Sequence, residues 1–163
     1  MRSYPFAIDF LLLPAAFGQR ESPWDVHNMK PRQAKERALS EDNRRKREEM
    51  MRRTKRFALA IIRLSSSLPR SLVSKVLGGQ VLRSGTSVGA HYREACRAKS
   101  RADFVSKIEG ALQELDETSY WLELLQEIYV EKRAQAEILM TEANELISIF
   151  VSVVRSVKLS TPR

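Results

Sequence analysis

Residues 139–157 read LMTEANELISIFVSVVRSV, and their apolar side chains recur in alternating steps of four and three residues. Residues at this spacing lie on one face of an α-helix, because the helix has about 3.6 residues per turn. The stretch therefore predicts an amphipathic helix with one apolar face. The residues of that face are Leu139, Ala143, Leu146, Phe150, Val153 and Val157.

Three earlier segments show the same helical spacing and no strand-like alternation. Pro69 predicts that the first of them ends at the preceding residue, and Ser100, followed by Asp103, is typical of a helix N-terminus. Short connections favour antiparallel neighbours, so we predict an all-α fold, an antiparallel up-down four-helix bundle. The expected buried positions are Phe57, Ile61, Leu64 and Leu68, then Leu77, Val81, Ser84, Val88, His91 and Ala95, and then Phe104, Ile108, Ala111, Leu115, Leu122, Leu125 and Tyr129.

We expect the chain to have two parts, a bundle domain over residues 50–163 and an N-terminal extension over residues 1–49 that is loosely ordered or partly helical. The apolar run Phe6–Phe17 has twelve residues, fewer than the roughly 20 that span a bilayer. A signal peptide is a second interpretation of this run, although Asp9 within it argues against that. A later translation start at an internal methionine is a third. We expect a cytoplasmic protein without membrane contact.

Positive charge is concentrated in the middle of the chain. The sequence has 163 residues, of which 28 are Lys or Arg and 20 are Asp or Glu, so its formal net charge is +8. Residues 29–56 have a net charge of +7, residues 57–100 of +6 and residues 101–163 of −4. This distribution favours an anionic partner for the first half of the chain. Nucleic acid, either RNA or DNA, fits because phosphate contacts require charge rather than a particular motif.

Helical geometry directs the cations of the first two bundle helices away from the apolar faces, since each residue turns the helix by about 100°. The same charge pattern has two other uses. The basic side of one copy can contact the acidic side of the next and close a ring, or the basic face can dock an acidic protein. The candidate phosphate contacts are Arg52, Arg56, Arg63, Lys75, Arg83, Arg93, Arg97 and Lys99.

The sequence offers little for catalysis or metal binding. Cys96 is the only cysteine, which excludes an intramolecular disulfide and a thiolate zinc site. Paired metal ions in helical bundles use Glu-x-x-His motifs, and the sequence contains none. His91 is interpreted as a packed, hydrogen-bonded residue of the second helix. We therefore expect a non-enzymatic protein without catalytic residues, metal or cofactor.

Two motifs carry a resemblance to a known family. They consist of residues 83–95, RSGTSVGAHYREA, with Ala98, Ser100, Asp103, Phe104 and Lys107, and of residues 117–125, ETSYWLELL. In combination they resemble the family of 23S rRNA intervening-sequence proteins, over about residues 54–159.

The resemblance implies an antiparallel four-helix bundle that assembles as a homopentamer and has no catalytic activity. It also implies kinship with the accessory protein of diversity-generating retroelements, a basic pentameric barrel that binds nucleic acid and a reverse transcriptase. An adaptor that docks such an acidic protein partner is therefore the alternative function. The motif residues expected to have structural roles are Ser87, His91, Glu94, Phe104, Lys107, Glu117 and Trp121.

One position departs from the pattern of that family, which usually has Asn where this sequence has His91. Asn offers an amide donor and a carbonyl acceptor, whereas neutral His offers one donor and one acceptor on a ring. His91 can keep the hydrogen bonding of this position but needs more room. The role that the Asn has in the family is therefore open for His91.

Overall fold

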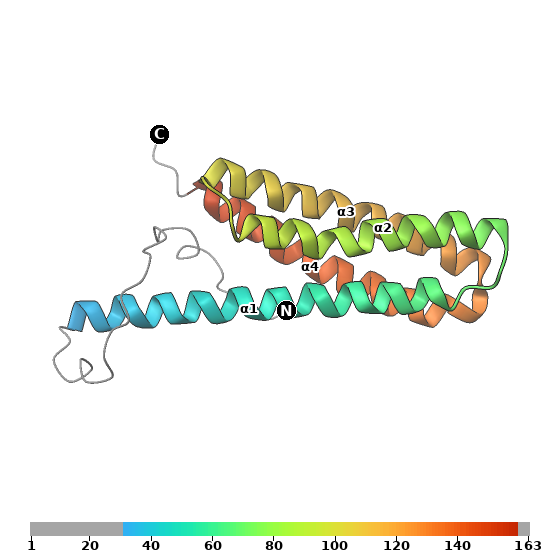
Figure 1. Ribbon diagram of the computed structural model, residues 1–163, viewed down its shortest axis with the longest axis horizontal. Coiled ribbons are helices and arrows are strands. Elements are labelled where there is room, and N and C mark those ends of the chain that lie inside the picture. Colours follow the sequence, from blue (N-terminus) through green and yellow to red (C-terminus); the bar gives the residue numbers. More distant parts are fainter. Residues whose placement is uncertain (1–30, 160–163) are drawn as a thin grey trace.

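The computed structural model describes residues 31–159, which form four helices joined by short connections. The helices are α1 (Pro31–Ser66), α2 (Leu72–Ala95), α3 (Arg101–Ile128) and α4 (Arg133–Leu159), with a 3-10 turn, η2 (Val130–Lys132), before α4. Figure 1 shows the chain direction reversing at each connection, so that consecutive helices lie side by side. The prediction of an all-α bundle is confirmed, and the described residues contain no strand.

Local chemistry sets the helix boundaries close to the predicted positions. α1 ends three residues before Pro69, and Ser71 then caps α2 by accepting a hydrogen bond from the amide of Ser74 at 3.0 Å. Ser100 caps α3 in the same way, accepting from the amide of Asp103 at 3.1 Å. The Asp103 carboxylate in turn accepts from the amide of Lys99 at 2.9 Å, which satisfies a second free donor at this helix start.

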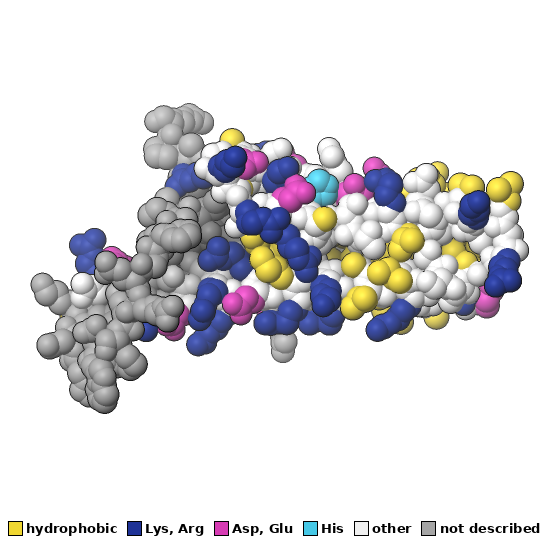
Figure 2. Space-filling model, in the orientation of Figure 1, with side chains coloured by type: hydrophobic (Ala, Val, Ile, Leu, Met, Phe, Trp, Pro, Cys, Tyr) yellow, Lys and Arg dark blue, Asp and Glu magenta, His cyan; other side chains and the backbone are white. Residues whose placement is uncertain are grey.

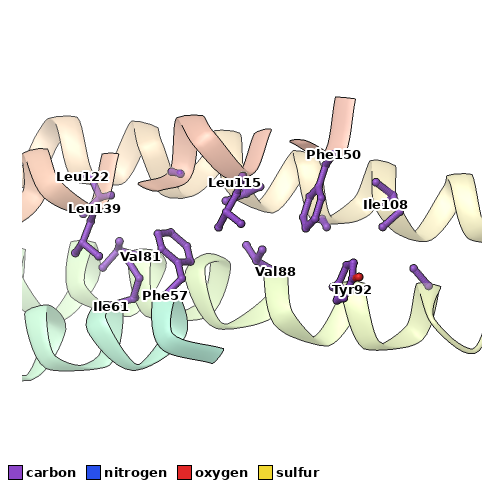
Figure 3. Packing of buried hydrophobic residues seen from close by; sticks show 14 of the residues in the cluster. Phe57, Ile61, Val81, Val88, Tyr92, Ile108, Leu115, Leu122, Leu139 and Phe150 are labelled. Atoms are coloured by element: carbon purple, nitrogen blue, oxygen red, sulfur yellow. The ribbon is translucent and has the colours of Figure 1, made fainter. Parts of the chain in front are cut away.

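The core runs along the bundle axis, and all four helices contribute to it (Figure 3). Most predicted positions are buried, but the buried face of α2 differs from the prediction at His91. His91 is half-buried, and the adjacent Tyr92 is only 4% exposed and stacks on Phe150 of α4 with ring centroids 5.6 Å apart. The prediction for His91 was wrong because α2 also buries Gly85 and Gly89, which have no apolar side chain to mark that side.

Smaller differences occur at the helix ends. Val154, rather than Val153, is buried in the last turns of α4. The predicted core positions Leu68, Leu77 and Tyr129 are half-buried, because they lie beside the turns that join the helices.

The first helix is longer than the predicted bundle domain. α1 continues without interruption across residues 49 and 50, so residues 31–49 of the expected extension are helical. In Figure 1 this N-terminal part of α1 projects beyond the ends of the other helices. The apolar run Phe6–Phe17 lies outside the described residues. No helix between residues 31 and 159 is sufficiently long and apolar to cross a membrane.

Candidate nucleic-acid interface

The eight candidate cations lie on the outside of the bundle, and none is in its packed centre. Arg93 is half-buried, and the exposed members are Arg52, Arg56, Arg63, Lys75, Arg83, Arg97 and Lys99. Figure 2 shows Lys and Arg side chains gathered over α1 and the C-terminal half of α2. The part of the same face near the α1–α2 turn is mostly hydrophobic and uncharged. Basic charge is therefore concentrated toward one end of the α1–α2 face.

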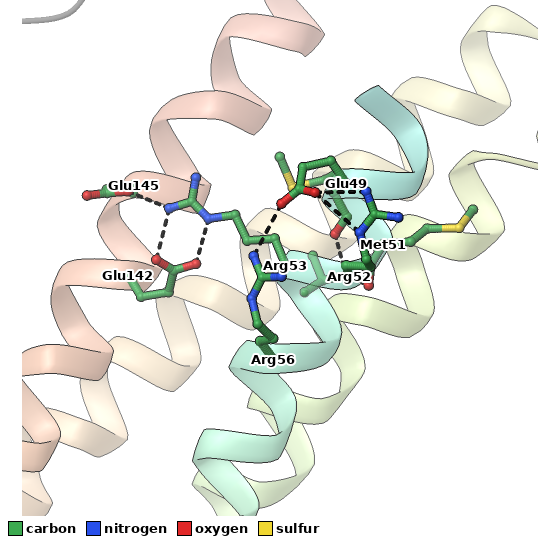
Figure 4. Close-up of polar contacts among 9 residues, drawn as sticks. Glu49, Met51, Arg52, Arg53, Arg56, Glu142 and Glu145 are labelled. Atoms are coloured by element: carbon green, nitrogen blue, oxygen red, sulfur yellow. Dashed lines mark hydrogen bonds and ion pairs between the residues drawn. The ribbon is translucent and has the colours of Figure 1, made fainter. Parts of the chain in front are cut away.

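Three of the eight cations are paired with carboxylates of their own chain. Arg52 and Arg56 both bind Glu49, with shortest N–O distances of 2.9 and 3.3 Å (Figure 4). These hydrogen bonds, the one from Arg52 first, hold the pKa of Glu49 below its ordinary value. Arg83 binds Glu114 at 3.3 Å and also contacts Glu117, both on α3. A phosphate that approaches these arginines has to compete with a carboxylate already in place.

The other five cations have no ion pair with any carboxylate of residues 31–159. They are Arg63, Lys75, Arg93, Arg97 and Lys99. The Arg93 guanidinium donates one hydrogen bond, from Nη1 to the carbonyl oxygen of Gly89 at 2.9 Å, and keeps its charge uncompensated. These five side chains are the part of the predicted set that is open to an external anion.

The structure adds a cation that the sequence analysis did not single out. Arg47 is half-buried on α1 and acts electrostatically on Tyr92 of α2 and on Cys96, the residue that follows this helix, so it faces the second helix. Its signal in the sequence is the basic run of residues 44–47, RRKR. That run fell within the expected extension, and only the continuity of α1 brings it against the bundle.

The motif residues concentrate where α2 meets α3. Glu94 binds Lys107 at 2.9 Å, and this hydrogen bond lowers the pKa of Glu94 and raises that of Lys107. Glu117 reaches back to Arg83, as described above. Phe104 is buried in the core, and the Ser87 hydroxyl donates to the carbonyl oxygen of its own helix at Arg83. The motif therefore includes much of the surface that joins these two helices.

His91 packs on a glycine of α3. A Cβ atom at Gly110 would lie 3.0 Å from Cε1 and 3.1 Å from Nδ1 of His91, so the imidazole takes up the space of the missing side chain. Nδ1 is buried and has no hydrogen-bond partner among the described residues. Gly110 thus supplies the room that a ring needs at this position, while Nδ1 makes no hydrogen bond. Nε1 of the half-buried Trp121, beside the Tyr120 ring, is buried in the same unpartnered way.

The part of the chain that forms these contacts matches a known protein family. The family model described as 23S rRNA-intervening sequence protein matches residues 46–152, which include both motifs and the α2–α3 surface. The chain belongs to this family. The resemblance carried by residues 83–95 and 117–125 is thereby confirmed.

A solved crystal structure is similar to this chain in sequence and fold. A crystal structure of a protein of unknown function from the S23 ribosomal protein family of Bacteroides thetaiotaomicron is 38% identical to this chain, with a TM-score of 0.62. The similarity covers 68% of this chain and 98% of that one. No curated protein matches the sequence.

The helices between residues 31 and 159 contain no cluster of potential metal ligands. Within residues 31–159, no three or more His, Cys, Asp or Glu side chains lie close enough together to hold a metal ion.

The family match starts at residue 46, inside the basic run of α1. The projecting N-terminal part of that helix therefore lies almost wholly outside the matched residues.

Proposed function

We propose that this protein is a non-enzymatic, oligomeric four-helix bundle that binds the backbone of RNA or DNA through the basic faces of α1 and α2. The observation that carries the proposal is the set of five exposed or half-buried cations on these helices and the following turn that no described carboxylate neutralises. Phosphate contacts depend on such charges, and they need no base-reading motif.

The same proposal includes self-assembly into a ring, for which the family resemblance suggests five copies. Taken together, α1 and α2 have more Lys and Arg than Asp and Glu, whereas α3 and α4 together have more Asp and Glu than Lys and Arg, chiefly because of α3. Large hydrophobic side chains are exposed on both halves, such as Val73 and Val76 on α2 and Ile138 on α4. A contact between unlike halves of neighbouring copies is heterologous, and such contacts close into a ring when the rotation between copies allows it.

Binding is tested by titrating the protein into labelled single-stranded RNA, duplex RNA and duplex DNA of one sequence, at several salt concentrations. If all five cations contact phosphates, the slope of log affinity against log salt is about −4 to −5 for duplex DNA. Lys75→Gln should reduce this slope by about 1. Arg155→Gln, an exposed cation on α4, is the matched control and should leave it unchanged.

A flat salt dependence would defeat the phosphate-contact proposal. Tight binding to an acidic protein, with no affinity for any oligonucleotide, would favour the adaptor function instead. Light scattering at low and high salt tests the ring, and a monomer under both conditions would contradict it.

A further inference from the structure

The connection between α1 and α2 borders an open hollow of about 420 Å³ on the surface of the bundle. The hollow is lined by the end of α1, by the connection itself and by the first turns of α2. In Figure 1 this connection lies at the end of the bundle opposite the projecting part of α1. Sites for small organic molecules typically have volumes of about 300–1,000 Å³. The hollow is therefore large enough to take one such group.

The lining of the hollow is mostly apolar. Leu68 and Leu82 contribute half-buried side chains, and Gly78 and Gly79 contribute backbone without side chains. α1 packs directly on the first of these glycines, because a Cβ atom at Gly78 would lie 3.0 Å from Cδ1 of Leu68. The hydroxyl of Ser65 donates to the carbonyl oxygen of Gly78 at 3.0 Å, which holds the two helices together beside the hollow.

Gly79 differs from Gly78, because no contact within the fold requires a glycine there. Gly79 is exposed, and no atom lies within 4 Å of the position that its Cβ would occupy. A glycine inside a helix is less favourable than an alanine, so this residue lowers the stability of α2 without any gain in packing. What it does provide is uncovered backbone at the hollow, which a flat ligand can approach closely.

Two cations also line the hollow. They are Arg70, in the connection, and Lys75, on α2, and both side chains are exposed. Neither forms an ion pair with a carboxylate of residues 31–159. All the lining residues fall between positions 65 and 82, where the sequence has no Asp or Glu. The hollow therefore combines an apolar lining with two uncompensated positive charges, a combination that suits a ligand with a flat apolar part and an anionic part.

We infer that the hollow takes one unpaired base of a bound single strand, and that Arg70 and Lys75 hold a phosphate next to that base. This inference rests on the proposed function and names its preferred substrate, a single-stranded nucleic acid rather than a duplex. The bases of a duplex are stacked and paired, whereas those of a single strand can turn outward into a protein.

The position of the hollow suits a strand that follows α2. Lys75 is one of the five uncompensated cations of the candidate interface, and Arg93, another of the five, lies about 27 Å farther along the same helix. A single strand that covers this length can contact the cations with its phosphates and place one base in the hollow.

The first experiment uses the unmodified full chain. It compares the affinity for single-stranded RNA with the affinity for a strand of the same length that keeps the sugar-phosphate backbone but lacks the bases. We expect the complete strand to bind about tenfold more tightly, the effect of burying one apolar group. The two strands carry the same charge, so phosphate contacts alone predict equal affinities, and equal affinities would overturn the inference.

The second experiment fills the hollow. Gly79→Leu should weaken the binding of single-stranded RNA by about tenfold and leave the affinities for the base-free strand and for duplex RNA unchanged. Leucine favours a helix more than glycine does, so the variant should keep the fold, which circular dichroism checks. Ser148→Leu is the control, because it adds the same side chain at an exposed position of α4 and should change no affinity. If Gly79→Leu weakened single-stranded and duplex RNA equally, the hollow would not be a base site.

The third experiment tests the phosphate contact. Arg70→Gln should reduce the salt slope for single-stranded RNA by about 0.7, the value of one phosphate contact on a single strand. Arg155→Gln on α4 is again the matched control and should leave the slope unchanged. If Arg70→Gln behaved like this control, the phosphate would not lie between Arg70 and Lys75.

The inference and the proposed function fail in different ways. If oligonucleotides bind with a steep salt dependence, but the base-free strand binds as tightly as the complete one or Gly79→Leu behaves like Ser148→Leu, the base site is wrong and the proposed function stands. If no oligonucleotide binds at low salt, both are wrong.

Discussion

α1 contacts its two neighbours in different ways. Toward α2 it packs on glycines, and a Cβ atom on Gly85 would lie 2.8 Å from Cγ1 of Ile61. α1 approaches α4 less closely than it approaches α2, and the main polar link between α1 and α4 is Arg53. The Arg53 guanidinium forms two hydrogen bonds with Glu142, at 2.7 and 2.9 Å, and also reaches Glu145 (Figure 4). Close packing therefore positions α1 against α2, whereas an ion pair links α1 to α4.

The difference determines how each side responds to change. A close-packed seam has no spare volume, and salt does not screen it. An ion pair near the surface is worth less and weakens as salt is added, because counter-ions compete with it. Substitutions on the α2 side should therefore cost more stability than substitutions on the α4 side.

The largest effect is expected from Gly85→Ala. The new methyl group would collide with Ile61, which is completely buried and has no room to move, so we expect the free energy of unfolding to fall by about 1–3 kcal/mol. Gly79→Ala is the matched control on the same helix, since no atom lies within 4 Å of its Cβ position. It should raise stability by about 0.5–1 kcal/mol through helix propensity. Urea unfolding measures both, and equal effects would show that the seam is loose.

The second largest loss of stability is expected from a polar contact between α2 and α3. The buried Thr118 hydroxyl lies 2.9 Å from the hydroxyl of Ser84 and 2.6 Å from the carbonyl oxygen of Glu114. Thr118→Val keeps the volume but removes a partner of Ser84, at a cost of about 1–2 kcal/mol. In the double variant with Ser84→Ala the cost should be smaller than the sum of the two single costs. Additive costs would argue that the two hydroxyls do not interact.

The α2 side also shows what the sequence could and could not predict. Pro69 and Ser100 identified two helix boundaries, and the steps of three and four residues identified most of the core. The position of Tyr92 in the core, with His91 at its edge, was missed because Gly85 and Gly89 carry no hydropathy signal. Each glycine leaves space on the surface of α2, and the side chains of α1 that lie against it cannot be identified from the sequence of α2 alone.

The candidate interface was predicted only in part, for a similar reason. Helical geometry correctly put Arg52, Arg56 and Arg83 on the outside, but it could not show that each has a carboxylate partner. Glu114 and Glu117 lie more than thirty positions after Arg83, and only the α2–α3 packing brings them to it. Arg47 was missed because its basic run was assigned to the extension.

On the α4 side, Arg53→Met tests the charge-based link. The Arg53 side chain is 20% exposed and its pair with Glu142 has two parallel hydrogen bonds, so we expect a loss of about 1 kcal/mol in low salt. The loss should shrink in 1 M salt, whereas the effect of Gly85→Ala should not. Arg52→Met, which breaks an exposed pair within α1, is the control and should cost less than about 0.5 kcal/mol. A loss for Arg53→Met that is independent of salt would mean that packing of the side chain matters more than its charge.

The smallest effect concerns an exposed pair of the α2–α3 surface and appears only in acid. Lys107 holds the pKa of Glu94 below its ordinary value of 4.5 in the folded protein. A carboxylate with a depressed pKa stabilises the fold above the unfolded-state value, and its contribution disappears as the pH falls through the lower folded-state value. NMR titration should therefore give Glu94 a pKa below 4.5, and Lys107→Gln should raise it. Lys158→Gln, which breaks the separate pair with Glu109, should leave the pKa of Glu94 unchanged. If both variants shifted the pKa of Glu94 equally, this pKa would be set by the overall charge of the bundle and not by the pairing of Glu94 with Lys107.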